Sequence, residues 1–275
     1  MPSPPDNAAP LRTALLVLAA IAPVVSIFLI GHGVIVAVAP LFVSHMLLLY
    51  PTLVANSQWL GPVFTSFHTT AREVWITIDD GPSPAHTRAM LDILQQFDAR
   101  ATFFVVGQYA ETHPHLLTEI LTRGHSLANH TNTHPSRTFW CASARRIRRE
   151  IDGCAEHLRS TAERPAQFFR APAGMKNFFV HPALARRGLV LIGWTVRGLD
   201  TVKQDPVKVA ERVEKHARPG AIVLLHEGHH GEKHPDFQPR CLELTLQRLA
   251  ARGYKFVIPQ PEQLRCSRGR CPRQV

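Results

Sequence analysis

The hydrophobic pattern divides the chain into an apolar N-terminal part and a longer part in which strand-like and helix-like segments alternate. Residues 14–30 form an uncharged apolar run, Gly31-His32-Gly33 interrupts it, and residues 34–50 form a second apolar run. Each run is at the short end of the roughly 17–25 residues that a helix needs to cross a bilayer. The pattern predicts a hairpin of two transmembrane helices joined by a tight glycine turn.

Two other interpretations of this apolar N-terminal part remain open. One is a cleaved signal peptide with its cleavage site after Ala39, although Pro40 follows at once and disfavours cleavage there. The other is one long anchor helix with an amphipathic partner lying in the interface. With the hairpin as the leading interpretation, we expect a multi-pass protein of a bacterial-type inner membrane. The positive charges that flank the two runs are few: Arg12 before the first, and Arg72, beside Glu73, after the second. They do not determine on which side of the membrane the rest of the chain lies.

From residue 73 onward, strand-like and helix-like segments alternate. The expected strands cover residues 73–78, 102–106, 125–128, 167–170, 189–195, 221–226 and 255–258. The expected helices between them cover residues 87–97, 114–124, 142–159, 181–187, 206–216 and 240–252. This alternation predicts an α/β protein with a parallel sheet, and either a closed barrel or a doubly wound sheet fits it.

The same pattern sets the expected domain boundaries. Five segments follow one another: an N-terminal tail (1–13), the two membrane helices (14–50), a connector (51–72), the α/β domain (73–260) and a basic C-terminal tail (261–275). The connector carries several apolar residues, which predicts that it lies against the membrane or the domain.

The charge balance points to an anionic partner. The chain has 31 Lys and Arg against 21 Asp and Glu, a formal net charge of +10. Nucleic acid suits such a balance, but no nucleic-acid motif is present, so we expect no nucleic acid and favour anionic membrane lipids beside the anchor. Among the five cysteines, Cys266 and Cys271 either close a small loop or stay as free thiols.

The first chemical signal stands at the end of the first strand. Val74 to Ile78 are almost entirely apolar, and Asp79-Asp80 follow directly before Gly81-Pro82. Adjacent carboxylates near a core repel each other and need a counter-charge, for which a metal ion is one source. A helix cap or a solvated turn explains the pair equally well when it is taken alone.

A histidine pair strengthens the metal interpretation. His130 and His134 follow the third strand, and two histidines four residues apart reach one metal ion from a helix or a tight loop. No Glu follows His130, which excludes the helical metalloprotease motif. In parallel α/β folds, functional residues gather at the carboxyl ends of the strands, where these histidines would meet the two aspartates.

Three further strand ends carry polar residues, namely Arg170, Asp200 and His226. Singly, a surface salt bridge or a hydrogen-bonded core histidine explains each. Five strand ends that carry Asp, His, Arg, Asp and His in turn predict a common site.

The five motifs together resemble those of the polysaccharide deacetylases of the NodB-homology type, carbohydrate esterase family 4. The resemblance extends over residues 73–258 and includes Thr77-Ile78-Asp79-Asp80-Gly81-Pro82 and His130-Thr131-Asn132-Thr133-His134. It implies a distorted (β/α) barrel of about seven parallel strands behind the membrane hairpin.

The resemblance also implies roles for single residues. One divalent metal ion, with Zn²⁺ first and Co²⁺ as an alternative, is expected on Asp80, His130 and His134. Asp79 is the expected general base and His226 the general acid. The remaining site residues are expected to orient these groups (Arg170, Asp200) or to bind substrate (Ala173, Trp194, Leu224).

Three departures from the family's motifs concern the substrate. Ala173 replaces a tyrosine of the third motif, and Arg197 and Thr201 replace the first and last residues of the fourth motif, Asp-x-x-Asp-Trp. The positions expected to hold the metal and to move protons are retained. We therefore expect the usual chemistry on an unusual substrate.

The resemblance implies hydrolysis of a carbon–nitrogen amide bond, other than a peptide bond, in an acylated sugar. The sugar belongs to a polysaccharide, a glycolipid or a lipid-linked glycan, and the membrane anchor favours the lipid-linked forms. The alternatives are an O-acetyl ester hydrolase and a non-catalytic membrane-anchored glycan-binding protein. A metal-dependent phosphoesterase is disfavoured, because no glycine-rich phosphate-binding loop is evident.

Overall fold

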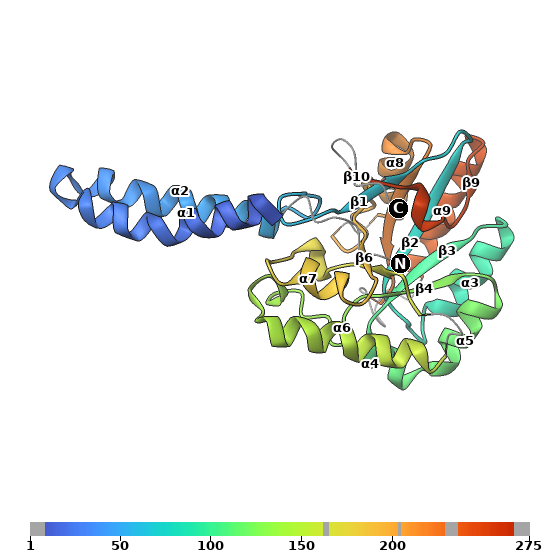
Figure 1. The fold of residues 1–275 in the computed structure, drawn as a ribbon. Helices are drawn as coiled ribbons and strands as arrows, with labels where there is room; N and C mark the ends of the chain where they lie inside the picture. Colours follow the sequence, from blue (N-terminus) through green and yellow to red (C-terminus); the bar gives the residue numbers. More distant parts are fainter. Residues whose placement is uncertain (1–8, 162–164, 203–204, 229–235, 267–275) are drawn as a thin grey trace.

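The chain forms a long helical hairpin that projects from an α/β domain (Figure 1). A computed structural model describes residues 9–161, 165–202, 205–228 and 236–266. The hairpin consists of α1 (Ala9–Phe28), the short 3-10 helix η1 (Ile30–His32) and α2 (Val34–Leu53). Gly33 closes the turn between them with φ 105°, a conformation that glycine adopts without strain.

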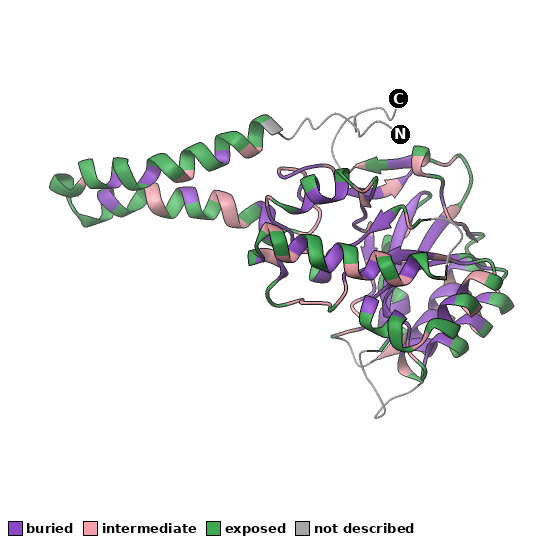
Figure 2. Ribbon diagram, turned by 60° about the horizontal axis from the view of Figure 1, so that its bottom comes forward, coloured by how far each residue is buried: buried purple, intermediate pink, exposed green. Residues whose placement is uncertain are grey.

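The surface of the hairpin is apolar. Figure 2 shows that most of its residues are exposed, and the spans Pro10–Phe28 and Val34–Leu53 have mean hydropathies of 2.2 and 2.0. Large side chains such as Phe28, Ile35 and Phe42 face outward with more than half of their surface exposed. By length and composition both helices are able to cross a membrane, a property that a signal sequence shares.

The domain is built on one curled, mainly parallel sheet. The strands are β1 (Phe64–Phe67), β2 (Glu73–Gly81), β3 (Ala101–Val105), β4 (Ser126–Asn129), β5 (Phe168–Phe169), β6 (Val190–Leu191), β7 (Val196–Arg197), β8 (Ala221–His226), β9 (Lys255–Phe256) and β10 (Leu264–Cys266). Their order is β10-β1-β8-β2-β3-β4-β5-β6, with β7 beside β8 and β9 beside β2. A parallel bridge between Phe64 and Ile192 joins β1 to the chain just after β6 and curls the sheet into a distorted barrel. The predicted fold class is confirmed.

Helices cover the outside of this sheet. They are α3 (Thr87–Gln96), α4 (Gly107–Thr112), α5 (Pro114–Thr122), α6 (Ala144–Arg159), α7 (Val180–Ala185), α8 (Pro206–His216) and α9 (Phe237–Ala251). Side chains of β2 alternate between two cores, as the strand period of two requires. Val74, Ile76 and Ile78 pack with the helices, whereas Trp75 packs inside the barrel with Phe104.

Several segments differ from the sequence prediction. Of the strand expected over residues 189–195, only Val190–Leu191 forms a strand, β6, and β7 begins beyond it at Val196. Gly193 lies between the two strands and close to the connector, since its ideal Cβ position is 2.3 Å from Asn56 Oδ1. Residues 264–266, expected in the C-terminal tail, form β10 and pair antiparallel with β1. Neither β1 nor α4 was expected. Cys271 lies outside the described residues, so its pairing with Cys266 stays a prediction.

The connector lies against the α/β domain and fixes the end of the hairpin to it. Lys176 is fully buried, and its Nζ donates hydrogen bonds to the carbonyl oxygens of Val54 and Ala55 at 2.9 and 2.8 Å. Arg12 of α1 donates to the carbonyl of Leu60 at 3.1 Å. These contacts satisfy carbonyls of the connector, just beyond the C-terminus of helix α2.

We expect the substitution Lys176→Met to lower the free energy of unfolding of the detergent-solubilised protein by about 1–3 kcal/mol, because two carbonyls of the connector lose their buried donor. Thermal unfolding measures this loss as a lower Tm. Lys208→Met, at an exposed position of α8, is the matched control and should stay within about 0.5 kcal/mol of the wild type. An unchanged Tm of the Lys176 variant would show that the connector is held by other contacts.

Candidate active site

A β-bulge brings both carboxylates of the first motif to one pocket. Asp79 pairs with Phe104 of β3 and Gly81 pairs with Val105, so Asp80 is the extra residue of strand β2. Asp80 has φ 74°, a left-handed conformation that turns its side chain out of the strand alternation. Without the bulge, two adjacent side chains would point to opposite faces of the sheet.

The carboxylate of Asp79 is held inside the barrel by Arg170. The two residues are 2 % and 1 % exposed, and Arg170 Nη1 lies 2.6 Å from Asp79 Oδ1 and 2.9 Å from the hydroxyl of Thr77. The guanidinium also stacks on the ring of Phe104, 4.1 Å from its centroid. Burial lowers the pKa of Arg170, while the charge of Asp79 opposes this shift. The ion pair keeps Asp79 oriented toward the pocket.

The two histidines of the second motif converge on Asp80. His130 Nε2 and His134 Nε2 lie 3.2 and 3.1 Å from Asp80 Oδ1. The ligand atoms of the three residues all lie within 4.8 Å of one another. His130 Nδ1 hydrogen bonds to the carbonyl oxygen of Arg170 at 2.9 Å, which directs the other ring nitrogen to the cluster.

The chemistry of this donor set fits a divalent cation. Two imidazoles and one carboxylate are a common three-residue set for a metal that keeps further positions open, and zinc accepts these ligands. Burial alone would lower the pKa of His130, but Asp79 and Asp80 outweigh it and the pKa is raised. The negative charge that raises this pKa also attracts a metal ion. Metal ion and proton compete for the ring, because a ligating imidazole must be neutral.

A second pair, His226 and Asp200, faces the cluster across the pocket. Asp200 Oδ1 lies 2.9 Å from His226 Nδ1, and Asp200 Oδ2 accepts a hydrogen bond from the backbone N–H of His226 at 2.7 Å. Burial alone would lower the pKa of His226, but the Asp200 carboxylate outweighs it and the pKa is raised. The ring is therefore held as a proton donor.

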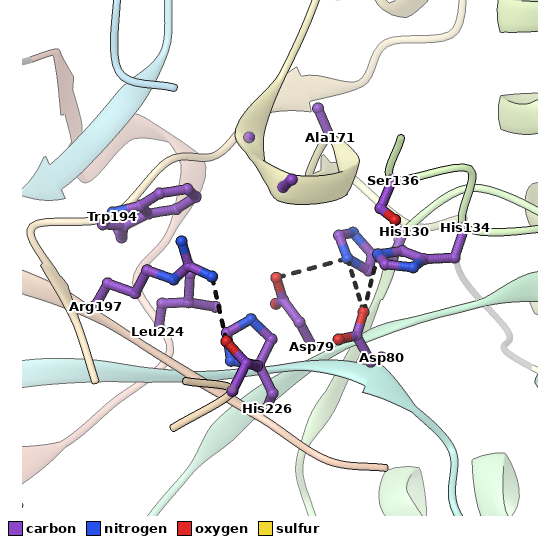
Figure 3. A pocket seen from close by; sticks show the side chains of 13 residues that line it. Asp79, Asp80, His130, His134, Ser136, Ala171, Trp194, Arg197, Leu224 and His226 are labelled. Carbon is purple, nitrogen blue, oxygen red and sulfur yellow. Dashed lines mark hydrogen bonds and ion pairs between the residues drawn. The ribbon is translucent and has the colours of Figure 1, made fainter. Parts of the chain in front are cut away.

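The structure brings all the residues predicted for the site together. The walls of the pocket are shown in Figure 3, with Asp79 between His226 on one side and the two histidines on the other. Ala173, Trp194 and Leu224 line the pocket as expected, while Arg170 and Asp200 lie behind it. Ala173 belongs to the 3-10 helix η3 (Pro172–Gly174) and has φ 53°.

From the sequence, no role was assigned to three further polar residues that line the pocket. They are Ser136, Arg197 and Thr201. The departures of Arg197 and Thr201 from the family's fourth motif were visible in the sequence. Their place on the pocket wall was not, because β7 is a separate strand whose position depends on pairing with β8.

A buried carboxyl group that the sequence did not single out supports the first motif from behind. Glu227 is fully buried, accepts a hydrogen bond from Thr87 Oγ1 at 2.7 Å, and fills the space beside Gly81. A Cβ atom at Gly81 would lie 1.6 Å from Glu227 Oε1, so only glycine fits there. Burial raises the pKa of Glu227 to about 8.

We expect Glu227→Gln to remove a pH dependence of stability. The folded chain keeps the Glu227 proton up to its pKa of about 8, whereas the unfolded chain loses it near the ordinary value of 4.5. The contribution of Glu227 is therefore fully present below the unfolded pKa and is lost as pH rises through the folded pKa. The variant should match the wild type near pH 5 and exceed it by about 4–5 kcal/mol near pH 9.

Chemical denaturation at both pH values tests this expectation. The exposed Glu262→Gln variant is the control and should follow the wild type at each pH. Equal stability of Glu227→Gln and wild type near pH 9 would contradict the assigned shift.

Comparisons with known proteins agree with this geometry. The family described as polysaccharide deacetylase matches residues 67–192. Chitooligosaccharide deacetylase of Bradyrhizobium sp. (strain ANU 289) is 34% identical over 189 residues, which cover 68% of this chain and 84% of that protein. Peptidoglycan-N-acetylglucosamine deacetylase of Bacillus cereus is 32% identical over 184 residues, 66% of this chain and 84% of that protein. The solved family 4 carbohydrate esterase from Streptomyces lividans, in complex with acetate, has 27% identity and a TM-score of 0.62 over 70% of this chain and 95% of that one.

These similarities define the class of the protein as a deacetylase, a hydrolase that acts on acylated groups. The chain belongs to the polysaccharide deacetylase family, the NodB-homology type of carbohydrate esterase family 4. The expected family and enzyme class are confirmed.

Proposed function

We propose that this protein hydrolyses the N-acyl amide bond of an acetylated amino sugar at a membrane surface, releasing acetate and a free amine. The observation that carries the proposal is that the metal cluster and the His226–Asp200 pair lie on opposite sides of Asp79. Asp79 lies between a three-residue metal cluster and the His226–Asp200 pair, all within one pocket. The named relatives deacetylate chitooligosaccharide and peptidoglycan N-acetylglucosamine, which supports an acetylated amino sugar as the substrate.

In this proposal Asp79 accepts the proton of the attacking water. Arg170 neutralises part of its charge and fixes the carboxylate, with Oδ1 turned to the guanidinium and Oδ2 toward the pocket, 3.7 Å from His130 Nε2. A carboxylate held in this way needs little reorganisation when the proton moves. The backbone N–H of Ala173, in its left-handed conformation at the pocket wall, is the proposed donor to the developing oxyanion.

His226 donates a proton to the leaving amine. Its raised pKa keeps the ring protonated, and Asp200 fixes Nδ1 so that the proton on Nε2 faces the pocket. The base and the acid thus stand on opposite sides of the scissile amide. Leu224, beside His226 in the wall, is proposed to contact the acetyl group.

Asp80, His130 and His134 are the residues that would hold a divalent ion, with zinc the first choice. When bound, such an ion polarises an amide carbonyl and lowers the pKa of water.

The hairpin is proposed to anchor the enzyme in a membrane. Its exposed apolar surface is what a bilayer would cover, and anionic lipids suit the basic composition of the chain. An enzyme whose domain is fixed to the end of its anchor reaches lipid-linked or glycolipid substrates more readily than distant polymer.

We expect Asp79→Asn and His130→Ala to lose deacetylase activity for different reasons. Asp79→Asn should abolish turnover while the bound metal remains, because the amide accepts no proton. His130→Ala should lose bound metal, because the cluster loses one of its three ligands. Metal content after dialysis, together with acetate release, separates the two variants. An active Asp79→Asn enzyme, or full metal content in His130→Ala, would contradict the assignment.

We expect Asp200→Asn to move the alkaline limb of the pH–activity profile to lower pH and to reduce kcat by roughly a hundredfold. Loss of the carboxylate removes the charge that raises the pKa of His226, so the acid is deprotonated at lower pH. The exposed Asp98→Asn is the control and should keep the wild-type profile. A reduced rate with an unmoved limb would mean that Asp200 supports the fold rather than the acid.

A further inference from the structure

One cation of the pocket takes no part in the proposed mechanism. Arg197 ends strand β7 and lines the pocket beside Trp194 and Leu224. Figure 3 shows it on the His226 side of Asp79, away from the metal cluster.

The guanidinium of Arg197 has more donors than the protein satisfies. It lies 5.9 Å from the ring centroid of Trp194, and Nη2 donates to Thr201 Oγ1 at the long distance of 3.4 Å. Its Nε is buried and has no hydrogen-bond partner among the described residues. Within the same residues no carboxylate forms an ion pair with it. A guanidinium carries five N–H donors, so most of this group is left for a ligand.

The other charges of the pocket are compensated. Asp79 pairs with Arg170, and Asp200 pairs with His226. Asp80 faces the two imidazoles of the metal cluster. Arg197 is the charge left over, so the pocket favours an anion at this position. The planar fork of arginine matches the paired oxygens of a phosphate or a carboxylate.

The position of Arg197 assigns the anion to the sugar side of the substrate. His226 is the proposed proton donor to the leaving amine, so the sugar that carries this amine lies on the same side. An anion that reaches Arg197 is therefore assigned to this sugar.

The same wall is connected directly to the end of the anchor. The carbonyl of Trp194 accepts a hydrogen bond from Asn56 Nδ2 at 2.9 Å, and Asn56 follows the last residue of α2, Leu53, by three positions. Gly174 lies between the connector and the indole, since its ideal Cβ position is 2.4 Å from the Cβ of Ala55.

Aromatic residues mark this end of the hairpin. Tyr50 of α2 packs on Trp59 of the connector, with ring centroids 4.8 Å apart. Tyrosine and tryptophan are enriched where a membrane meets water. The wall that carries Arg197 therefore lies next to the part of the chain that would sit at the level of lipid head groups, where a lipid-linked sugar carries its phosphate.

We propose that Arg197 binds the phosphate of an acetylated amino sugar that is joined to a membrane lipid through a phosphodiester. The inference rests on the proposed function for the orientation of the sugar. It goes further because it assigns a negative charge to the substrate and names the residue that recognises this charge.

The test compares three synthetic probes with the metal-loaded full-length protein in detergent. They are N-acetylglucosamine joined to a decyl chain through a phosphodiester, its neutral decyl glycoside, and the decyl glycoside of N-acetylmuramic acid, which carries a carboxylate. Binding is measured by calorimetry in the inactive Asp79→Asn background, and acetate release is measured in the otherwise wild-type chain.

We expect the phosphodiester to bind more tightly than the neutral glycoside by roughly ten- to a hundredfold, the range for a hydrogen-bonded charge. Arg197→Gln should reduce this ratio to near one, and Arg197→Lys should restore part of it. Arg218→Gln, an exposed arginine away from the pocket, should keep the wild-type ratio.

The outcomes distinguish the inference from the proposed function. Equal binding of the phosphodiester and the neutral probe, or an unchanged ratio in Arg197→Gln, overturns the inference even if acetate is released. Tighter binding of the muramic acid probe than of the phosphodiester overturns the assignment to a lipid phosphate. Absence of acetate release with an Arg197-dependent binding preference would instead count against the proposed function alone.

Discussion

The buried ion pair of Arg170 and Asp79 is the interaction on which the site depends. Charges are expensive inside a protein unless each is paired and hydrogen-bonded, and this guanidinium makes four hydrogen bonds. It reaches Asp79 and Thr77 on β2, while Nε and Nη2 donate to the carbonyls of Ile192 and Gly193 at 3.3 and 2.9 Å. One side chain thus ties β2 to the segment that follows β6 and orients the proposed base.

The backbone of Arg170 extends this network to the metal cluster. Its carbonyl accepts from His130, so the position of the ring and the position of the base depend on the same residue. The bulge at Asp80 supplies the other half of the arrangement, because it directs two adjacent carboxylates into one pocket. With Asp79 paired to the arginine and Asp80 turned to the histidines, the two acids have separate environments and are proposed to have separate tasks.

The connector gives the pocket its second constraint. Lys176, Asn56 and Gly174 pack the end of the hairpin against the wall that holds Trp194. The α/β domain is thus docked to the end of its helical hairpin rather than joined to it by a free linker. In an ordinary polymer-binding groove the same wall would carry the tyrosine and tryptophan of the family motifs. Here it carries Ala173, Thr201 and an arginine with unused donors, which is consistent with a smaller, charged substrate.

The sequence by itself determined the hairpin, the parallel α/β domain and the five strand ends with their polar residues. These follow from local patterns, since hydrophobic periodicity and the chemistry at strand ends are written in neighbouring residues. It also showed that Arg197 departs from the motif, without indicating where its side chain lies. Only the tertiary structure decided that β2 bulges at Asp80, that β6 ends at Leu191 and β7 begins at Val196, and that the connector packs against the segment that holds Trp194. Each of these depends on pairing between segments that are distant along the chain, such as Asn56 with Trp194, and local patterns carry no information about such pairings.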